Sequence, residues 1–157
     1  MIFVRPQYFT GLVILLVTLL LSGCASNIKP YRAELPQNLE VISNIESIEA
    51  SLHIYSLDKQ CKTTYLGSVD LDRDSLRLGI DTGQPSFLVT GFDSSSFWSA
   101  SSGYMDYGIT LTPRKSYRYE IGVSYIDNIY NVKVYEINRS SGNKREMEDR
   151  ELELCRS

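Results

Sequence analysis

The strongest constraint on the fold is a strict alternation of apolar residues on both sides of the dipeptide Asp127-Asn128. Successive side chains of a β-strand point to opposite faces, so apolar residues at every second position predict a strand with one buried face. Asp-Asn is typical of the tight turn between two antiparallel strands. The pattern predicts an amphipathic hairpin with apolar positions at Tyr117, Tyr119, Ile121, Val123 and Tyr125, then Tyr130, Val132 and Val134.

Shorter runs of the same type fill the chain before this hairpin. We expect a strand from about Ile48 to Leu57, although Ser43 and Glu46 could instead form the capping box of a helix. The segments 76–80 and 86–92 are expected to form two neighbouring strands, and 104–111 another.

The last charged stretch, 144–153, fits either an edge strand or a short helix. Several short alternating runs without a long helical pattern predict an all-β fold. The expected architecture is a small antiparallel β-sandwich of the immunoglobulin or transthyretin type, or a small barrel.

The N-terminus differs in kind from the rest of the chain. Met1–Thr10 carries one basic residue, Arg5, and the segment 12–21 is apolar but too short to cross a bilayer. It ends in Leu21-Ser22-Gly23-Cys24, which resembles the lipobox of bacterial lipoprotein precursors. We therefore expect a signal peptide at 1–23, a lipidated N-terminus and tether at 24–38, and a single β domain at 39–157.

The lipobox resemblance implies the position of the mature protein. In this class the cysteine, here Cys24, receives diacylglycerol and usually a fatty acid such as palmitate, and two or three chains anchor a protein firmly. Ala25 and Ser26 follow Cys24 where an aspartate would imply retention in the inner membrane. The expectation is a protein anchored by lipid to the periplasmic face of the bacterial outer membrane.

Two cysteines, Cys61 and Cys155, remain after Cys24 is assigned to lipid. In the oxidising periplasm an even pair of this kind favours a disulfide over a metal site. We expect Cys61 to bond Cys155, which would join the C-terminus to the domain.

Several classes of function lack a basis in the sequence. The formal net charge is −3 without a basic block, so nucleic-acid binding has no electrostatic support. No metal-ligand spacing and no cofactor motif is present, and the lone histidine, His53, is expected to be structural. Ile80-Asp81-Thr82-Gly83 resembles the Asp-Thr-Gly motif of aspartic proteases, but a turn explains these four residues better.

The best candidate for binding is an aromatic pair in a Ser/Gly-rich segment, Phe97-Trp98, together with Tyr104 and Tyr107 that follow it. Large aromatic residues in such a loop either fold back onto the domain or are covered by a partner. The hairpin tyrosines could stack on sugars, although packing in the core is the favoured reading.

These observations predict a non-catalytic binding or assembly module of the cell envelope, with an envelope protein or a glycan as partner. Leu52-His53-Ile54-Tyr55-Ser56-Leu57 resembles the early strand of type VI secretion lipoproteins, which implies an inner-membrane partner as one alternative. An envelope hydrolase using Asp81 and a purely structural component are the others.

Overall fold

The computed structural model describes residues 29–32, 35–45, 48–93, 104–127 and 129–148. Within these ranges every regular element is a strand, and the order along the chain is β1 (Leu39–Ile45), β2 (Glu49–Leu57), β3 (Thr63–Asp70), β4 (Ser75–Leu78), β5 (Ser86–Asp93), β6 (Tyr104–Leu111), β7 (Tyr117–Ile126), β8 (Ile129–Asn138) and β9 (Lys144–Glu146). The predicted residues Cys24, Phe97, Trp98 and Cys155 lie outside the described residues.

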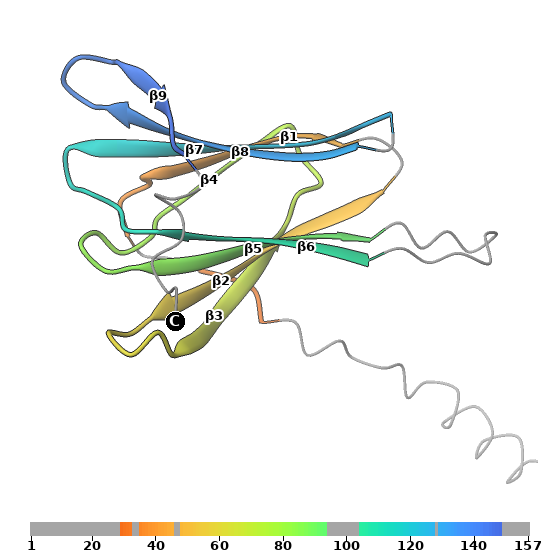
Figure 1. The fold of residues 1–157 in the computed structure, drawn as a ribbon, viewed down its shortest axis with the longest axis horizontal. Helices are drawn as coiled ribbons and strands as arrows, with labels where there is room; N and C mark the ends of the chain where they lie inside the picture. The colour runs from red at the N-terminus through yellow and green to blue at the C-terminus, as the bar shows by residue number, and fades with distance from the viewer. Residues whose placement is uncertain (1–28, 33–34, 46–47, 94–103, 128, 149–157) are drawn as a thin grey trace, which may run out of the picture.

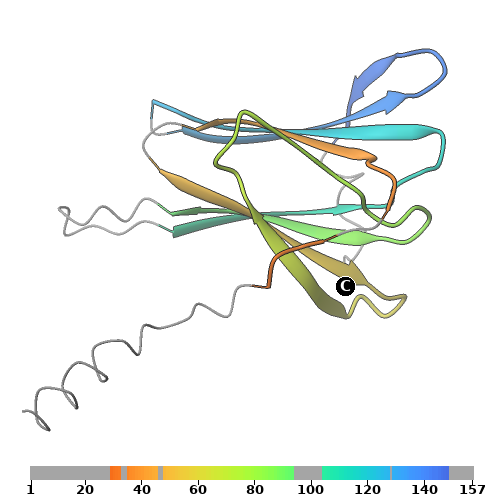
Figure 2. The same cartoon turned by 180° about the vertical axis from the view of Figure 1, so that it is seen from behind.

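The strands form two sheets that lie one over the other (Figure 1; Figure 2 gives the view from behind). Sheet A has the strand order β3-β2-β5-β6, and sheet B has the order β4-β1-β7-β8-β9. All neighbouring strands run antiparallel except β1 and β7, which are parallel. The expected all-β fold is confirmed, and of the two predicted architectures the sandwich is the one observed.

The core lies between the two sheets and is built from every second residue of each strand. From sheet A it takes Leu52, Ile54, Leu88 and Phe92, none of which retains exposed surface. From sheet B it takes Leu39, Val41, Tyr119, Ile121 and Val123, each at most 1% exposed. A fully buried side chain of this size stabilises the fold by about 1.5–3 kcal/mol. The predicted hairpin is confirmed as β7 and β8, with its apolar face turned inward.

The strand expected from about Ile48 to Leu57 is confirmed as β2, and Ser43 lies in β1, paired to β7, and not in the alternative helix. One expectation about the strands is corrected. The strands expected to be neighbours at 76–80 and 86–92 belong to different sheets, because β4 is in sheet B and β5 is in sheet A. The connection crosses the sandwich at Ile80, which is 2% exposed and is held by the side chain of Asn38. The strand reading of the last charged stretch is confirmed over Lys144–Glu146.

Part of the segment expected to be a tether, 24–38, is bonded to the domain. Pro30 forms a parallel bridge with Ser68 of β3, and Tyr31 packs against the core. Asn38 is 4% exposed and donates its side-chain amide to the Ile80 carbonyl at 2.8 Å. The domain therefore begins no later than Lys29, because backbone and side-chain bonds rather than an apolar pattern fix this segment.

Candidate functional site

The outward side of sheet A carries an aromatic and polar surface that we call face A. It consists of the residues that alternate with the core positions of the four strands. These are Ser51, His53 and Tyr55 on β2, Tyr65 on β3, Phe87, Val89 and Gly91 on β5, and Tyr104, Asp106, Gly108 and Thr110 on β6.

One half of face A is a cluster of half-buried rings. The ring centroids of Tyr55 and Tyr65 lie 5.1 Å apart, those of Tyr55 and Phe87 lie 5.9 Å apart, and His53 stands 6.2 Å from Tyr65. These separations and tilted orientations are typical of favourable aromatic pairs. Three strands therefore contribute to one continuous aromatic cluster.

A β-bulge between β2 and β3 places Tyr65 in this cluster. Ile54 pairs with Gly67 but the next residue, Tyr55, pairs with Tyr65, so the register shifts between them. Without that shift Tyr55 would oppose Leu66, and Tyr65 would point toward the core. The bulge turns a tyrosine outward that simple alternation would turn inward.

Gly108 provides the space for the Phe87 ring. A Cβ atom at Gly108 would lie 2.9 Å from both Cε2 and Cζ of Phe87, closer than real side chains approach. The ring of Phe87 therefore lies across the neighbouring strand β6 rather than standing upright.

The other half of face A is polar and converges over Gly91. A Cβ at Gly91 would lie 3.1 Å from the Tyr104 hydroxyl, 3.3 Å from Asp106 Oδ1 and 3.6 Å from Ser51 Oγ. A hydrogen bond to Asp106, burial, and the charges of Asp106, Tyr55 and Asp93 raise the pKa of Tyr104 above its usual value. Hydroxyl and carboxylate groups from the two neighbouring strands, β2 and β6, thus surround one glycine of β5.

Ser51 and His53 bring a hydroxyl and an imidazole into contact, with 3.1 Å between Oγ and Nε2. That distance suits a nucleophile and its base, but acyl transfer also needs donors for the developing oxyanion. Ser51 lies in the middle of sheet A, where β2 pairs with β3 on one side and β5 on the other. The backbone of β2 is engaged in these ladders, so we derive a polar binding contact and no catalytic step.

The predicted binding residues separate in the structure. Tyr104 is on face A and is 65% exposed, whereas Tyr107 packs against the core from the inner side of β6. The two tyrosines therefore do not share a surface, because residues three apart in a strand point to opposite faces. Sequence reasoning missed Tyr55, Tyr65 and Phe87, which occupy positions where an amphipathic strand normally carries polar residues.

Asp81 is exposed on the turn between β4 and β5. Gly83, in the same turn, has a φ of 82° and donates its amide to the Pro113 carbonyl at 2.7 Å. Glycine adopts a positive φ without the steric penalty that other residues pay, so turn geometry accounts for the Asp-Thr-Gly sequence.

Cys61 lies between β2 and β3, and its sulfur is disulfide-bonded. Cys155, the expected partner, is outside the described residues, so this pairing remains a prediction.

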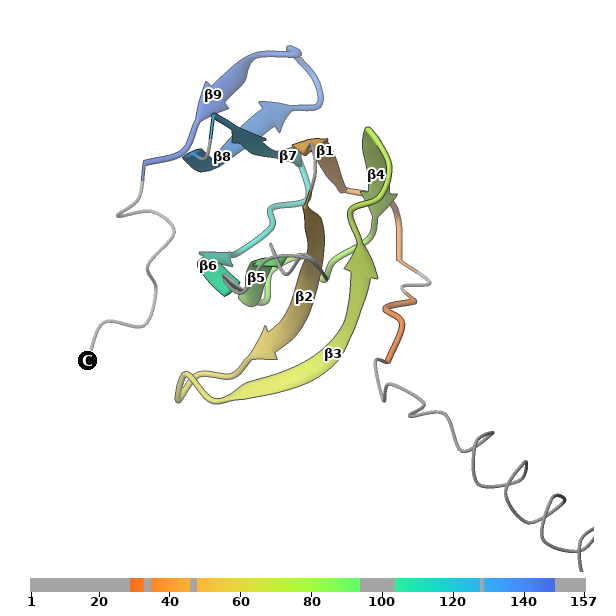
Figure 3. The same ribbon diagram turned by 90° about the vertical axis from the view of Figure 1, so that its right-hand side faces the viewer.

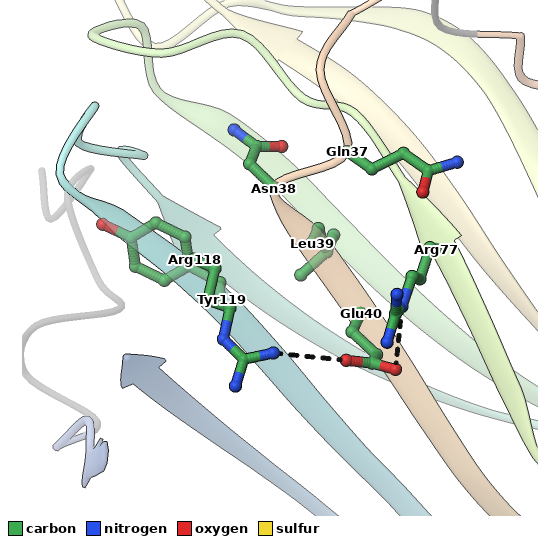
Figure 4. A pocket seen from close by; sticks show the side chains of 7 residues that line it. All are labelled: Gln37, Asn38, Leu39, Glu40, Arg77, Arg118 and Tyr119. Atoms are coloured by element: carbon green, nitrogen blue, oxygen red, sulfur yellow. Dashed lines mark hydrogen bonds and ion pairs between the residues drawn. The ribbon is translucent and has the colours of Figure 1, made fainter. Parts of the chain in front are cut away.

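A hollow of about 120 Å³ lies on sheet B at the start of β1 (Figure 4). Glu40 accepts there from Arg77 Nε at 3.1 Å, and Arg118 approaches the same carboxylate at 3.8 Å. Both arginines that line this small hollow pair with the Glu40 carboxylate, which makes it a weaker candidate than face A.

Glu136 is the one charged residue that is buried among the described residues, at 8% exposed. Arg145 Nη2 donates to Glu136 Oε1 at 2.7 Å, and Arg114 donates to the other oxygen. This pairing compensates the burial of the carboxylate and leaves it a structural role.

Among the described residues there is no group of three or more His, Cys, Asp or Glu side chains that could hold a metal ion. The same part of the chain contains no helix that could span a bilayer.

Comparison with known proteins gives no family for this chain. No family model matches it, and no curated protein matches it. Among solved structures it is similar to transthyretin from Sparus aurata, with 9% identity over 64% of this chain and 98% of that one, at a TM-score of 0.48. Sea bream transthyretin in complex with thyroxine matches with 10% identity over 68% and 99% of the two chains, at a TM-score of 0.47.

Proposed function

We propose that this chain is a lipoprotein of the bacterial envelope, anchored through Cys24 to the periplasmic face of the outer membrane. Its sandwich acts there as a non-catalytic binding module. The lipobox residues Leu21-Ser22-Gly23-Cys24 support the anchor, and the predicted pairing of Cys61 with Cys155 would fit an oxidising compartment.

Face A is the proposed binding surface, and a glycan of the envelope is the proposed ligand. The observation that carries this is the ring cluster of Tyr55, Tyr65 and Phe87, which lies on the solvent side of a sheet whose other side already forms the core. A contiguous apolar patch on the outer face of a sheet is typical of a binding site.

A saccharide matches both halves of face A. Aromatic rings pack against the apolar faces of pyranoses, while the Tyr104, Asp106 and Ser51 oxygens over Gly91 suit sugar hydroxyls. Ser51 and Tyr55 are four residues apart on one strand, which places the polar and aromatic halves about 13 Å apart. A short run of linked sugars could therefore contact both halves.

The test is retention of the lipidated full chain, in detergent, on purified peptidoglycan sacculi. Removing the Tyr55 ring (Tyr55→Ala) should lower the bound fraction about tenfold, equivalent to about 1.4 kcal/mol. Tyr135, an outward-facing tyrosine of sheet B, supplies the matched control Tyr135→Ala, which should bind as the unchanged chain does.

Asp106→Asn provides a second variant that keeps every ring in place, and it should also reduce retention. Equal loss in Tyr55→Ala and Tyr135→Ala would contradict the assignment of face A. Retention that is unchanged in both Tyr55→Ala and Asp106→Asn would contradict it as well, as would capture of an envelope protein in place of sacculi.

A further inference from the structure

The segment just after the proposed anchor is bonded to one edge of the sandwich. We call Lys29–Arg32 the strap. The Ser68 amide donates to the Lys29 carbonyl at 2.9 Å, and the Tyr31 amide donates to the Ser68 carbonyl at 2.8 Å. The Tyr31 hydroxyl donates to the Gly79 carbonyl at 2.7 Å. The strap therefore extends sheet A beyond β3 and is tied to the end of β4.

Two glycines leave the space that this N-terminal segment occupies. A Cβ at Gly67 would lie 2.7 Å from the Tyr31 backbone nitrogen and Cα, and one at Gly79 would lie 2.6 Å from the Leu35 carbonyl oxygen. These neighbours are backbone atoms, which cannot move aside as a flexible side chain could. Glycine at these two positions therefore allows the backbone of Tyr31 and of Leu35 to pack directly on β3 and on the residue after β4.

Docking limits how far the domain can stand from its anchor. Between Cys24 and Lys29 there are only the residues Ala25, Ser26, Asn27 and Ile28. Five backbone steps span at most about 18 Å even when fully extended. That reach is about half the length of the ten-residue strand β7, roughly 33 Å, so the attachment point lies close to the strap.

We propose that the strap holds the β3–β4 edge of the sandwich against the phospholipid headgroup surface, with the β6–β9 edge directed away from it. This inference rests on the proposed lipidation of Cys24. Figure 3 shows the two edges on opposite sides of the molecule, with the strap beside β3 and β4. The edge needs no membrane affinity of its own, because the acyl chains supply the attachment.

This orientation has a consequence for face A. Sheet A runs from β3 at the membrane side to β6 at the far side. The plane of the sheet is therefore roughly parallel to the membrane normal, and its outer face does not lie flat on the bilayer. The polar half of face A, at Tyr104 and Asp106, then faces the periplasmic space and is open to a ligand approaching from there.

The experiment uses the lipidated chain in vesicles of phosphatidylethanolamine and phosphatidylglycerol that contain a nickel-chelating headgroup. A nitroxide is attached to Arg73→Cys, which lines the same hollow as Pro30 and Tyr31, or to Ser141→Cys in the turn between β8 and β9. Relaxation by nickel should be strong at position 73 and lost at position 141. Equal relaxation at the two positions would overturn the proposal.

In Gly79→Ala the new Cβ would lie 2.6 Å from the Leu35 carbonyl oxygen, so residue 79, whose carbonyl accepts from Tyr31, must shift. That shift should loosen the strap, and the difference between the two labels should then disappear. Gly122→Ala is the matched control, since a Cβ there meets nothing closer than the Lys133 carbonyl at 3.9 Å. Tyr31→Phe removes only the bond to Gly79 and should reduce the difference without unfolding the domain. If Gly79→Ala and Tyr31→Phe both leave the difference intact, the strap does not set the orientation.

Failure of the lipid anchor gives a separate result. A Cys24→Ala chain that still binds vesicles would contradict the proposed lipidation. Hydrogen exchange on that chain tests the strap alone, because the Tyr31 and Ser68 amides should be protected in the absence of any membrane. Exchange at the rate of open backbone would overturn the strap itself.

Discussion

The two outer faces of the sandwich carry different chemistry although both cover the same core. The outer side of sheet B, which we call face B, is crossed by ion pairs: Arg77–Glu40 at 3.1 Å, Lys144–Glu120 at 2.6 Å and Lys133–Glu146 at 3.2 Å. Face A instead carries the ring cluster of Tyr55, Tyr65 and Phe87. Folding requires apolar residues only on the inner faces, which form the core. The difference between the two outer faces therefore suggests that they have different roles.

Face B is what an antiparallel sheet presents to water by default. Its charged side chains lie on neighbouring strands, as Glu40 opposite Arg77 does, and such cross-strand pairs contribute little each, about 0–1 kcal/mol. Lys144 also lies 4.3 Å from the centre of the Tyr135 ring, so the aromatic residue of this face is covered by a cation. Face B is thus an ordinary hydrated face with cross-strand charge pairs, and face A departs from this pattern, which is why we propose it as the binding surface.

The largest contrast is expected from adding one methyl group to each face. Gly108→Ala pushes against the Phe87 ring, whose nearest atoms would be 2.9 Å away, while Gly122→Ala on face B has 3.9 Å of room. Overpacking of this kind costs about 1–3 kcal/mol, so urea unfolding should show that loss for Gly108→Ala and a change within about 0.5 kcal/mol for Gly122→Ala. Similar midpoints for both variants would show that Phe87 moves freely and that the cluster is not fixed.

A smaller effect is expected from the polar half of face A. Asp106→Asn removes the charge that, through a hydrogen bond, raises the pKa of Tyr104, so that pKa should fall toward its usual value. A ¹³C-labelled tyrosine titration, assigned with Tyr104→Phe, measures it. Because the folded pKa is the higher one, the contact stabilises the fold below the unfolded tyrosine pKa and is lost as pH rises through the folded one. An unchanged pKa in Asp106→Asn would contradict the contact.

The smallest effect should come from salt. Raising sodium chloride from 0.1 to 1 M shortens the screening length from about 10 to 3 Å and weakens the exposed pairs of face B. Lys144→Ala should therefore lower the stability by less than about 1 kcal/mol at low salt, and by less still at high salt. Retention on sacculi through face A should hardly respond to the same change. Retention that collapses with salt would instead assign binding to charged groups.

The sequence predicted the inner faces better than the outer ones. Alternation is set by core burial, so the hairpin of Tyr119 and Ile121 and the sandwich followed from it. The position of Tyr65 depends on a bulge, which is an extra residue in the pairing and leaves no pattern in one strand read alone. Gly108 and Phe87 are related only through the β5–β6 register, so the cluster could not be assembled before the pairing was known.

The strap was hidden for a different reason. Its residues are held by backbone bonds to Ser68 and by the space over Gly67, and Leu35, which follows it, lies over Gly79. None of these contacts leaves an apolar period in the strap itself. The glycines were visible in the sequence, but only the fold reveals which backbone passes over them. Contacts of this type are set by the partner strand, which a local reading of the chain does not include.

The parallel pairing of β1 with β7 has a consequence for the order in which the molecule forms. Leu39 pairs with Tyr119, so β1 can pair with β7 only after nearly the whole domain has been synthesised. Strands β2, β3, β5 and β6 meet through closer stretches of sequence and require less loop closure. In newly made chains, sheet A should therefore be paired before β1 has paired with β7. A chain that ends before Tyr117 would contain the aromatic cluster but lack most of sheet B, which buries the inner side of sheet A.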